Sequence, residues 1–365
     1  MKNTKVNGDL IKKYHEDLVF NYSEYPTKDN WDYKFKDLEY KKSLNDWLPR
    51  NIDEPIIFYV HTPFCEQLCY FCTCSKLITQ NYENVKNYLY QSLFKEIDLL
   101  FDFLEKNKIK LNVKEIFFGG GSPTYYKPDD FKALVDKLKS KFDFSNMGDF
   151  TVEIDPRRVD EERLLFYNTC GVNRLSFGVQ EFDLNVQKRI NRVQPPELFH
   201  KILTKKVREI YKTFNFDLLI GLPGQTNESM EKTMDKVIEI RPTQLQPALL
   251  AYKPWIAKYQ IKMVKDGPLP DFFDRKRLFE IVNEKLLKAG YKRAGFESYA
   301  LPNDPLAIAR KEKKALFNSL GLQKGAATNF VSVGSSAKGS LGDDYYSHNC
   351  YSTIMYKQLL DEGKL

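Results

Sequence analysis

The sequence lacks the long apolar segments that place a protein in or across a membrane. None of its 365 residues belongs to a run of about 18 uncharged apolar residues, the length that a transmembrane helix needs. Its N-terminus, MKNTKVNGDL, has no apolar stretch of the kind found in signal peptides. Internal repeats of solenoid length and low-complexity tracts are also missing. We therefore expect a globular protein of the cytoplasm with no membrane span.

A strong excess of one charge is missing as well. Lysine and arginine number 56 and aspartate and glutamate 49, which gives a formal net charge of +7, and the lysines are spread along the whole chain. No RNA-binding signature and no cluster of basic and aromatic residues stands out. We interpret the charge as an ordinary solvated surface and expect no nucleic-acid partner. An anionic small-molecule substrate is compatible with it.

Cysteine is scarce and unevenly placed. Four of the six cysteines lie in the stretch HTPFCEQLCYFCTCSK, residues 61–76, with the spacing C-x3-C-x2-C-x-C. Disulfides are disfavoured because thiols stay reduced in the cytosol. A structural zinc site would need a second ligand pair, and Cys170 and Cys350 are isolated. The third interpretation is an iron–sulfur cluster, in which three thiolates from one loop hold three irons and leave the fourth iron open.

The alternation of apolar runs and amphipathic stretches predicts an α/β fold. Candidate strands lie at residues 57–64, 115–120, 149–155, 174–180, 214–221 and 244–252. Candidate helices lie at residues 82–106, 127–142, 160–171 and 227–240, the last with Thr226 as N-cap, and from Asp274 to near Gly290. Such βα units imply a parallel sheet covered by helices, either a barrel or an open sheet. Residues 1–52 are interpreted as an irregular arm.

Each distinctive motif follows one of the predicted strands. The cysteines follow the first strand, GGGSPT the second, DPRR the third, QEF the fourth and GLPGQT the fifth. The carboxyl ends of parallel strands meet on one side of a sheet, where α/β enzymes place their active sites. The sequence therefore predicts a site on that side.

Taken in order, these motifs resemble the radical S-adenosylmethionine (SAM) superfamily and, within it, the oxygen-independent coproporphyrinogen III oxidase family. The resemblance rests on YVHTPFCEQLCYFCTC, GGGSPTYY, VEIDPRR, NRLSFGVQEF, QKRINR, FDLLIGLPGQT and YSEYPT, between about residues 10 and 345. It implies a partial (β/α)6 TIM-like barrel at residues 53–265, an N-terminal arm at 1–52 and a short α/β extension at 266–365. The family normally continues into a helical domain, so we expect a truncated or shortened C-terminal part.

The resemblance implies two kinds of cofactor, a [4Fe–4S] cluster and SAM. In the superfamily the open iron binds SAM, and an electron from the cluster cleaves SAM to a 5′-deoxyadenosyl radical that abstracts hydrogen from the substrate. A reducing partner such as flavodoxin or ferredoxin supplies the electron, and we expect a monomer.

The site residues carry over position by position. Cys65, Cys69 and Cys72 match the cluster ligands, and Cys74 matches a fourth family cysteine that is not a ligand. Contacts to SAM are implied for Tyr59, Phe71, Gly119, Gly120, Gly121, Ser122, Glu153 and Gln180. Contacts to a second SAM are implied for Arg192, Asp217 and Ala251. His61 is interpreted as orienting the cysteine loop.

The sequence also departs from the family near the expected substrate. NSLGLQK, residues 318–324, stands where the family has Asn-Phe-Gln-Gly-Tyr-Thr-Thr, and Lys338 replaces an apolar residue. Two enzymatic hypotheses result. One is oxidase chemistry in haem biosynthesis, which converts propionates to vinyl groups. The other is a paralogue that uses the second SAM as a methyl or methylene donor, as a methyltransferase or cyclopropanase. A non-catalytic haem- or metal-carrying protein is disfavoured, because the cysteines and the glycine turn are intact.

Overall fold

The computed structural model describes residues 36–318, 320–325, 327–343 and 345–365. Most of the predicted arm, including YSEYPT, lies outside these residues. The described part of the arm forms the helix α2 (Asp37–Trp47) and a 3-10 turn (Leu48–Arg50), so the prediction of irregular structure was wrong there. Leu44, Trp47 and Leu48 are buried on one side of this helix. Their spacing of three and four residues is the helical signal that the sequence interpretation overlooked.

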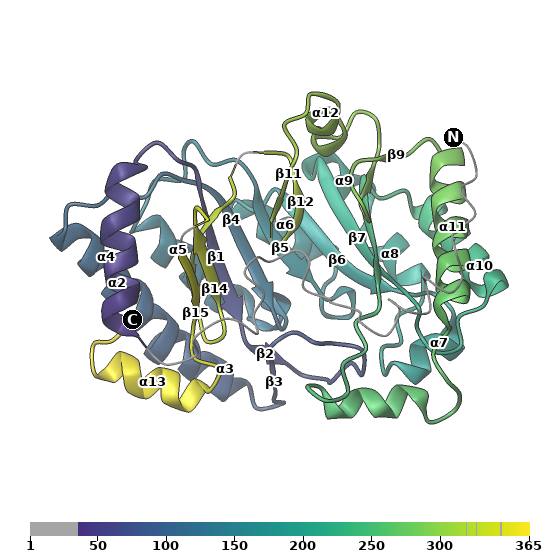
Figure 1. Cartoon of the computed structure of the whole chain (residues 1–365), viewed down its shortest axis with the longest axis horizontal. Helices are drawn as coiled ribbons and strands as arrows, with labels where there is room; N and C mark the ends of the chain where they lie inside the picture. The colour runs from purple at the N-terminus through teal and green to yellow at the C-terminus, as the bar shows by residue number, and fades with distance from the viewer. Residues whose placement is uncertain (1–35, 319, 326, 344) are drawn as a thin grey trace.

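Six parallel strands form the centre of the molecule, as predicted. They are β1 (Ile56–Thr62), β4 (Val113–Gly120), β5 (Phe150–Ile154), β6 (Arg174–Gln180), β7 (Thr213–Ile220) and β8 (Gln244–Leu249). They lie side by side in chain order and every neighbouring pair is parallel (Figure 1). The sixth strand is shorter than expected and ends at Leu249, which leaves Leu250–Tyr252 in the segment that follows.

Helices connect these strands; those between β6 and β7 were not predicted, and the others lie close to their predicted positions. The first connection, predicted as one helix, consists of α3 (Tyr82–Tyr88), a π turn (Leu89–Leu93) and α4 (Phe94–Lys106). The others include α5 (Pro128–Lys139), α6 (Glu161–Thr169), α7 (Leu184–Arg189), α8 (Glu197–Ile202), α9 (Lys205–Ile210) and α10 (Asn227–Ile240). Thr226 caps α10 as predicted. The next helix, α11 (Phe272–Lys288), begins before Asp274, which forms a capping box with the N-cap Asp271.

The last hundred residues extend the sheet at both edges. Beside β1 lie β13 (Asn329–Val333), which is parallel to it, and then β14 (Lys338–Leu341) and β15 (Tyr345–His348). Beside β8 lie the short antiparallel strands β10 (Tyr299–Ala300) and β9 (Lys292–Arg293). The helices α12 (Pro305–Lys311) and α13 (Thr353–Asp361) and the hairpin β11 (Leu316–Asn318)–β12 (Gly321–Gln323) complete this part.

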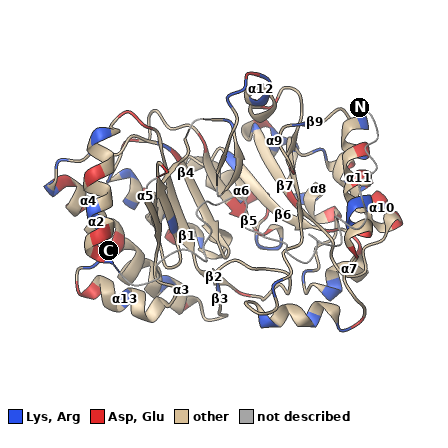
Figure 2. Cartoon of the chain, in the orientation of Figure 1, with Lys and Arg blue, Asp and Glu red and all other residues tan. Residues whose placement is uncertain are grey.

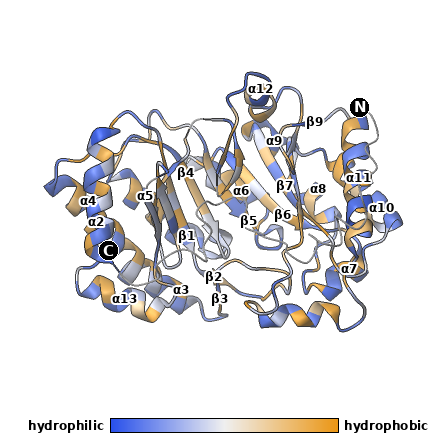
Figure 3. Ribbon diagram, viewed as in Figure 1, coloured by the Kyte–Doolittle hydropathy of each residue, from blue (hydrophilic) through white to orange (hydrophobic). Residues whose placement is uncertain are grey.

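The two faces of the central sheet differ in polarity. On β7, Phe214, Phe216, Leu218 and Ile220 belong to the main hydrophobic core, whereas Asn215 and Asp217 alternate with them on the opposite face. The strands β5 and β6 alternate in the same way. Since side chains of a strand point to opposite faces in turn, the core lies between the sheet and the helices, and the other face is polar. Figure 3 shows the matching alternation of hydrophobic and hydrophilic residues along α4, α10 and α11.

The surface carries both charge signs. In Figure 2 lysine and arginine alternate with aspartate and glutamate along the helices, and many form i,i+4 ion pairs such as Lys232 with Glu228. This agrees with the interpretation of an ordinary solvated surface. Within the described ranges, every helix is too short or too polar to cross a membrane.

Candidate active site

The cysteines lie on a loop that the protein closes by its own backbone. The loop leaves β1, passes through β2 (Phe64–Cys65) and returns at β3 (Leu77–Ile78), which pairs with β2 in parallel. Leu77 N donates to Pro63 O at 2.5 Å and Thr79 N to Cys65 O at 3.0 Å. Within the loop, Cys72 N donates to Cys69 O, and Tyr70 N reaches Ile190 O at 2.9 Å beyond β6. The cysteine backbone is therefore fixed at the carboxyl end of β1.

The four thiols differ in their surroundings. Cys69 is buried, Cys65 and Cys72 are half-buried, and Cys74 is exposed. Burial, together with the neighbouring Cys72 and Cys69, raises the pKa of Cys65 to about 12. A hydrogen bond with Cys74 lowers the pKa of Cys72 to about 6, with help from the Lys76 ammonium. Among the described residues, no three His, Cys, Asp or Glu side chains converge as they would around a single metal ion.

The glycine turn after β4 packs directly against this loop. A Cβ on Gly121 would lie 2.7 Å from Phe64 O, and one on Gly120, at φ +107°, would lie 2.7–2.8 Å from the His61 ring. Gly121 N donates to Thr62 O at 2.7 Å. These glycines are thus required by contacts within the protein, because any side chain would push the loop away.

Two buried carboxyl groups stand on the polar face of the sheet beside this turn. Glu153 on β5 accepts a hydrogen bond from Gly120 N at 3.1 Å, and burial together with the nearby Asp217 raises its pKa to about 8. Burial also raises the pKa of Asp217, although Asn215 and Ser176 donate to its oxygens at 2.7 and 3.0 Å. Two neighbouring acids in a buried site do not both ionise easily, which favours the protonated form of Glu153 at neutral pH.

Arg192 lies nearer to the cysteines than to Asp217. Its Nη2 donates to Gly178 O at 2.7 Å and its Nε to Gln194 Oε1 at 3.0 Å, while Nη1 lies 3.6 Å from Cys69 Sγ. Its ion-pair partner is Asp155, at 3.6 Å. Gln180 holds a left-handed backbone at φ +67°, an uncommon conformation for a residue other than glycine.

The remaining expected residues gather around the same loop. Tyr59 Oη and His61 Nδ1 are 3.0 Å apart, and His61 Nε2 is 3.0 Å from Ser75 O, so His61 does hold the loop as interpreted. Burial lowers the pKa of His61 to about 4, and Lys338 on β14 contributes to the same shift. Ser122 Oγ and Thr124 Oγ1 form a hydrogen bond of 2.8 Å.

Phe71 and Ala251 are joined by a buried residue that the sequence interpretation missed. Gln260 donates from Nε2 to Phe71 O and to Ala251 O, both at 2.9 Å, and its Oε1 accepts from Lys253 N at 2.6 Å. Gln260 lies in a 3-10 helix (Lys258–Val264) that follows β8. Its neighbour Tyr259 and Lys76 both donate to Cys72 O, at 2.5 and 3.1 Å.

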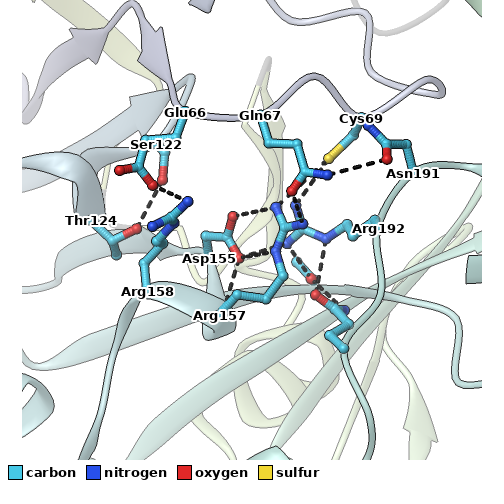
Figure 4. Close-up of polar contacts among 12 residues, drawn as sticks. Glu66, Gln67, Cys69, Ser122, Thr124, Asp155, Arg157, Arg158, Asn191 and Arg192 are labelled. Atoms are coloured by element: carbon cyan, nitrogen blue, oxygen red, sulfur yellow. Dashed lines mark hydrogen bonds and ion pairs between the residues drawn. The ribbon is translucent and has the colours of Figure 1, made fainter. Parts of the chain in front are cut away.

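The structure also reveals arginines that were assigned no role. Arg157, in the DPRR motif after β5, directs its Nη2 to Cys69 Sγ at 3.9 Å and its Nη1 to Gln67 Oε1 at 3.2 Å (Figure 4). The adjacent Arg158 pairs with Glu66 instead. The position of DPRR after a strand was the available signal, but spacing alone does not show which side chain turns toward a thiol.

These residues fit the expected cluster. One closed loop presents three thiols, and the cations Arg157, Arg192 and Lys76 stand beside two of them. Positive neighbours favour the thiolate, which is the form that binds iron. The turn of glycines and the protonated Glu153 face the same space, on the polar side of the sheet.

The hairpin β11–β12, which carries NSLGLQK, lies against the polar face of the sheet. Leu320 packs with Ile57 and Phe117, beside Tyr59, and Lys324 pairs with Asp149 at 2.5 Å. A Cβ on Gly321 would stand 3.5 Å from Gln246 Oε1 of β8. The segment that differs from the family motif therefore lies on the polar face of the sheet.

Comparison with known proteins gives consistent matches. The Radical SAM superfamily profile matches residues 59–237. The oxygen-independent coproporphyrinogen III oxidase of Pseudomonas aeruginosa is 33% identical over 362 residues, covering 98% of this chain and 76% of the relative. That of Salmonella typhimurium is 31% identical over all of this chain and 78% of its own. The solved structure of coproporphyrinogen III oxidase (HemN) from Escherichia coli, a radical SAM enzyme, matches with a TM-score of 0.84 and 32% identity, covering 96% of this chain and 78% of that one.

Proposed function

The chain belongs to the radical SAM superfamily and, within it, to the oxygen-independent coproporphyrinogen III oxidase family, and on this premise we propose that it decarboxylates propionate side chains of coproporphyrinogen III to vinyl groups. As a radical SAM enzyme it uses a [4Fe–4S] cluster and SAM and needs a reductant. The observation that supports the proposal best is the likeness of fold and sequence to the oxidases over nearly the whole chain.

We propose that Cys65, Cys69 and Cys72 hold the cluster. When bound, the cluster and SAM supply one-electron reductive cleavage of SAM and the hydrogen abstraction that follows. The protein's own part is to fix the loop, and the pairing of β2 with β3 does so independently of any iron. Cys74 is exposed and forms a hydrogen bond with Cys72, so we propose that it lies beside the ligands without binding iron.

We propose that the polar face of the sheet holds SAM. Glu153, protonated at neutral pH, would donate a hydrogen bond without placing a negative charge beside the carboxylate of SAM. Tyr59, Phe71, Ser122, Gln180 and the glycine turn would line the same molecule. Arg192, Asp217 and Ala251 would contact a second SAM, with Arg192 reaching it from its place beside Cys69.

The hairpin favours a second candidate function. Leu320 stands at the position where the family has a glutamine, and it packs on Ile57 and Phe117, two apolar residues of the otherwise polar face of the sheet. A less polar wall would suit a substrate other than a porphyrinogen with four carboxylates. In that case the second SAM would serve as a methyl or methylene donor.

An anaerobic assay separates these functions. Protein reconstituted with iron and sulfide should bind about four irons per chain, and with SAM, a reductant and coproporphyrinogen III it should give vinyl products and CO2. SAM cleavage without decarboxylation, together with methylated or cyclopropanated products from other substrates, would decide for the second function. The proposal also includes a cytoplasmic monomer that takes electrons from flavodoxin or ferredoxin, which size-exclusion and donor-driven SAM cleavage would test.

A further inference from the structure

We propose that Arg157 is a positioning residue that raises the reduction potential of the cluster by directing its guanidinium at the Cys69 sulfur. The inference rests on the proposed ligation of the cluster by Cys65, Cys69 and Cys72. It adds a residue outside the ligand and SAM sets and assigns it an electrostatic role.

The first support is the fixed orientation of the side chain. Arg157 Nε and Nη2 lie 2.9 and 2.7 Å from the two oxygens of Asp155, which is a bidentate pair, and its backbone N donates to Asp155 Oδ1 at 3.1 Å. Both side chains are more than four-fifths buried. A guanidinium held at two nitrogens, on a residue whose backbone binds the same carboxylate, keeps its remaining N–H groups in one direction, and that direction is the cysteine loop.

The second support is what those N–H groups reach. Arg157 Nη1 donates to Gln67 Oε1, and Gln67 Nε2 in turn donates to Asn191 Oδ1 at 3.2 Å. Asn191 Nδ2 donates to Leu68 O at 2.8 Å. Residues 66–69, the three-residue spacer and the second cysteine, are thus held by side chains from the end of β5 and from the segment after α7 (Figure 4). With these contacts in place, Arg157 Nη2 lies 3.9 Å from Cys69 Sγ, and Arg192 Nη1 lies 3.6 Å from the same sulfur.

The physical effect has a definite direction. One-electron reduction adds a negative charge to the cluster, and no bond to the protein forms or breaks in that step. Hydrogen bonds to the ligand sulfurs and nearby positive charge stabilise the more negative, reduced form. Because Arg157 is shielded from solvent, its charge is only weakly screened by salt. Removing it should therefore lower the potential and make reduction harder.

The chain offers a matched control in the next residue. Arg158 has the same chemistry, follows the same strand and also contacts the loop, yet it points away from Cys69 and pairs with Glu66. Its side chain is 42% exposed, against 18% for Arg157. A general loss of positive charge would affect both variants, whereas a directed contact to Cys69 would affect only one.

The experiment is a potentiometric titration of the reconstituted full chain, with dithionite as electron source and the reduced cluster followed by electron paramagnetic resonance. In Arg157→Gln the ratio of reduced to oxidised cluster at a fixed potential should fall about tenfold, which for a one-electron couple is a lowering of about 59 mV. Arg158→Gln should titrate like the wild type. Arg157→Lys, which keeps the charge but cannot form the bidentate pair, should lie between wild type and Arg157→Gln.

Equal potentials in wild type, Arg157→Gln and Arg157→Lys would overturn the inference. If Arg157→Gln binds no cluster, Arg157→Lys decides, and a wild-type potential in that variant would overturn the inference as well. Iron content and SAM cleavage by the wild type, measured in the same preparations, report on the proposed function separately. A wild type that binds about four irons and cleaves SAM, with no shift in the variants, refutes the role of Arg157 alone.

Discussion

The cysteine loop and the hairpin β11–β12 face the same side of the sheet but are held in different ways. The loop is fixed by backbone pairing of β2 with β3, by the backbone of Gly121, and by the side chains of Arg157, Asn191 and Tyr259. The hairpin is held by its own pairing, by Leu320 and Leu322, and by an ion pair of Lys324 with Asp149. Because the loop is held by more contacts than the hairpin, we expect sequence changes to be tolerated better in the hairpin than in the loop.

Removal of one predicted ligand should give the largest effect. Cys69→Ala removes the thiol that Arg157 and Arg192 contact. Iron content should therefore fall far below four irons per chain, and SAM cleavage should drop to background. Cys74→Ala, which changes an exposed thiol of the same loop, should keep its iron. Iron analysis and visible absorption would measure both, and full iron retention in Cys69→Ala would refute the ligand assignment.

The pH dependence of stability compares a carboxyl beside the loop with one beside the hairpin. Burial raises the pKa of Glu153 to about 8 and that of Glu115, near Lys324, to about 7. The folded state binds more protons than the unfolded state above about pH 4.5, so each group lowers stability as the pH rises toward its folded pKa. Glu153→Gln should reduce the fall in the free energy of unfolding with pH up to about pH 8, and Glu115→Gln only up to about pH 7. Each substitution should change the free energy of unfolding by a few kcal/mol at most.

Urea unfolding of the cluster-free protein at a series of pH values would measure these curves. The two variants should separate between pH 7 and 8, where Glu153 binds a proton in the folded state more strongly than Glu115 does. Identical curves for wild type and Glu153→Gln over this range would contradict the buried, protonated state of Glu153.

A pair of glycine substitutions tests how tightly each region is packed. A Cβ at Gly121 would meet the backbone oxygen of Phe64 at 2.7 Å, so Gly121→Ala should cost about 1–3 kcal/mol and displace the loop. Gly321→Ala has room for its Cβ but carries a φ of +98°, which should cost about 1 kcal/mol. Only Gly121→Ala should bind less iron. Equal iron binding in both variants would show that the loop tolerates displacement.

The smallest expected effect concerns the hairpin and the substrate. Leu320→Gln restores an amide at the position where the related oxidases have one, so the KM for coproporphyrinogen III should fall about fivefold, near 1 kcal/mol. SAM cleavage without substrate and iron content should stay unchanged. Steady-state kinetics would measure the KM, and an unchanged value would show that the hairpin does not contact this substrate.

The sequence predicted the six parallel strands well but the contacts between segments far apart in the chain poorly. The six parallel strands follow from apolar runs, and the cap Thr226 from local chemistry. The helix Asp37–Trp47 was missed because polar and aromatic residues hide the buried positions. The contacts of Arg157, Lys76 and Gln260 could not be predicted, since each joins segments far apart in the chain and depends on how the strand ends converge. The roles assigned to the SAM-contacting residues and the domain boundaries at residues 52 and 265 stay predictions.

The parallel pairing of β1 with β13 has a consequence for the order of events during synthesis. Residue 56 pairs with residue 329, so the strand that carries the cysteine loop keeps one open edge until 273 further residues have been made. At about 5–20 residues per second, the interval is on the order of ten seconds to a minute. During that time β4 can already pair with β1, while the backbone of His61 still awaits the turn at Gly334 that will cover it. The strand that carries the cysteine loop therefore reaches its final surroundings only after residues 329–334 have been made.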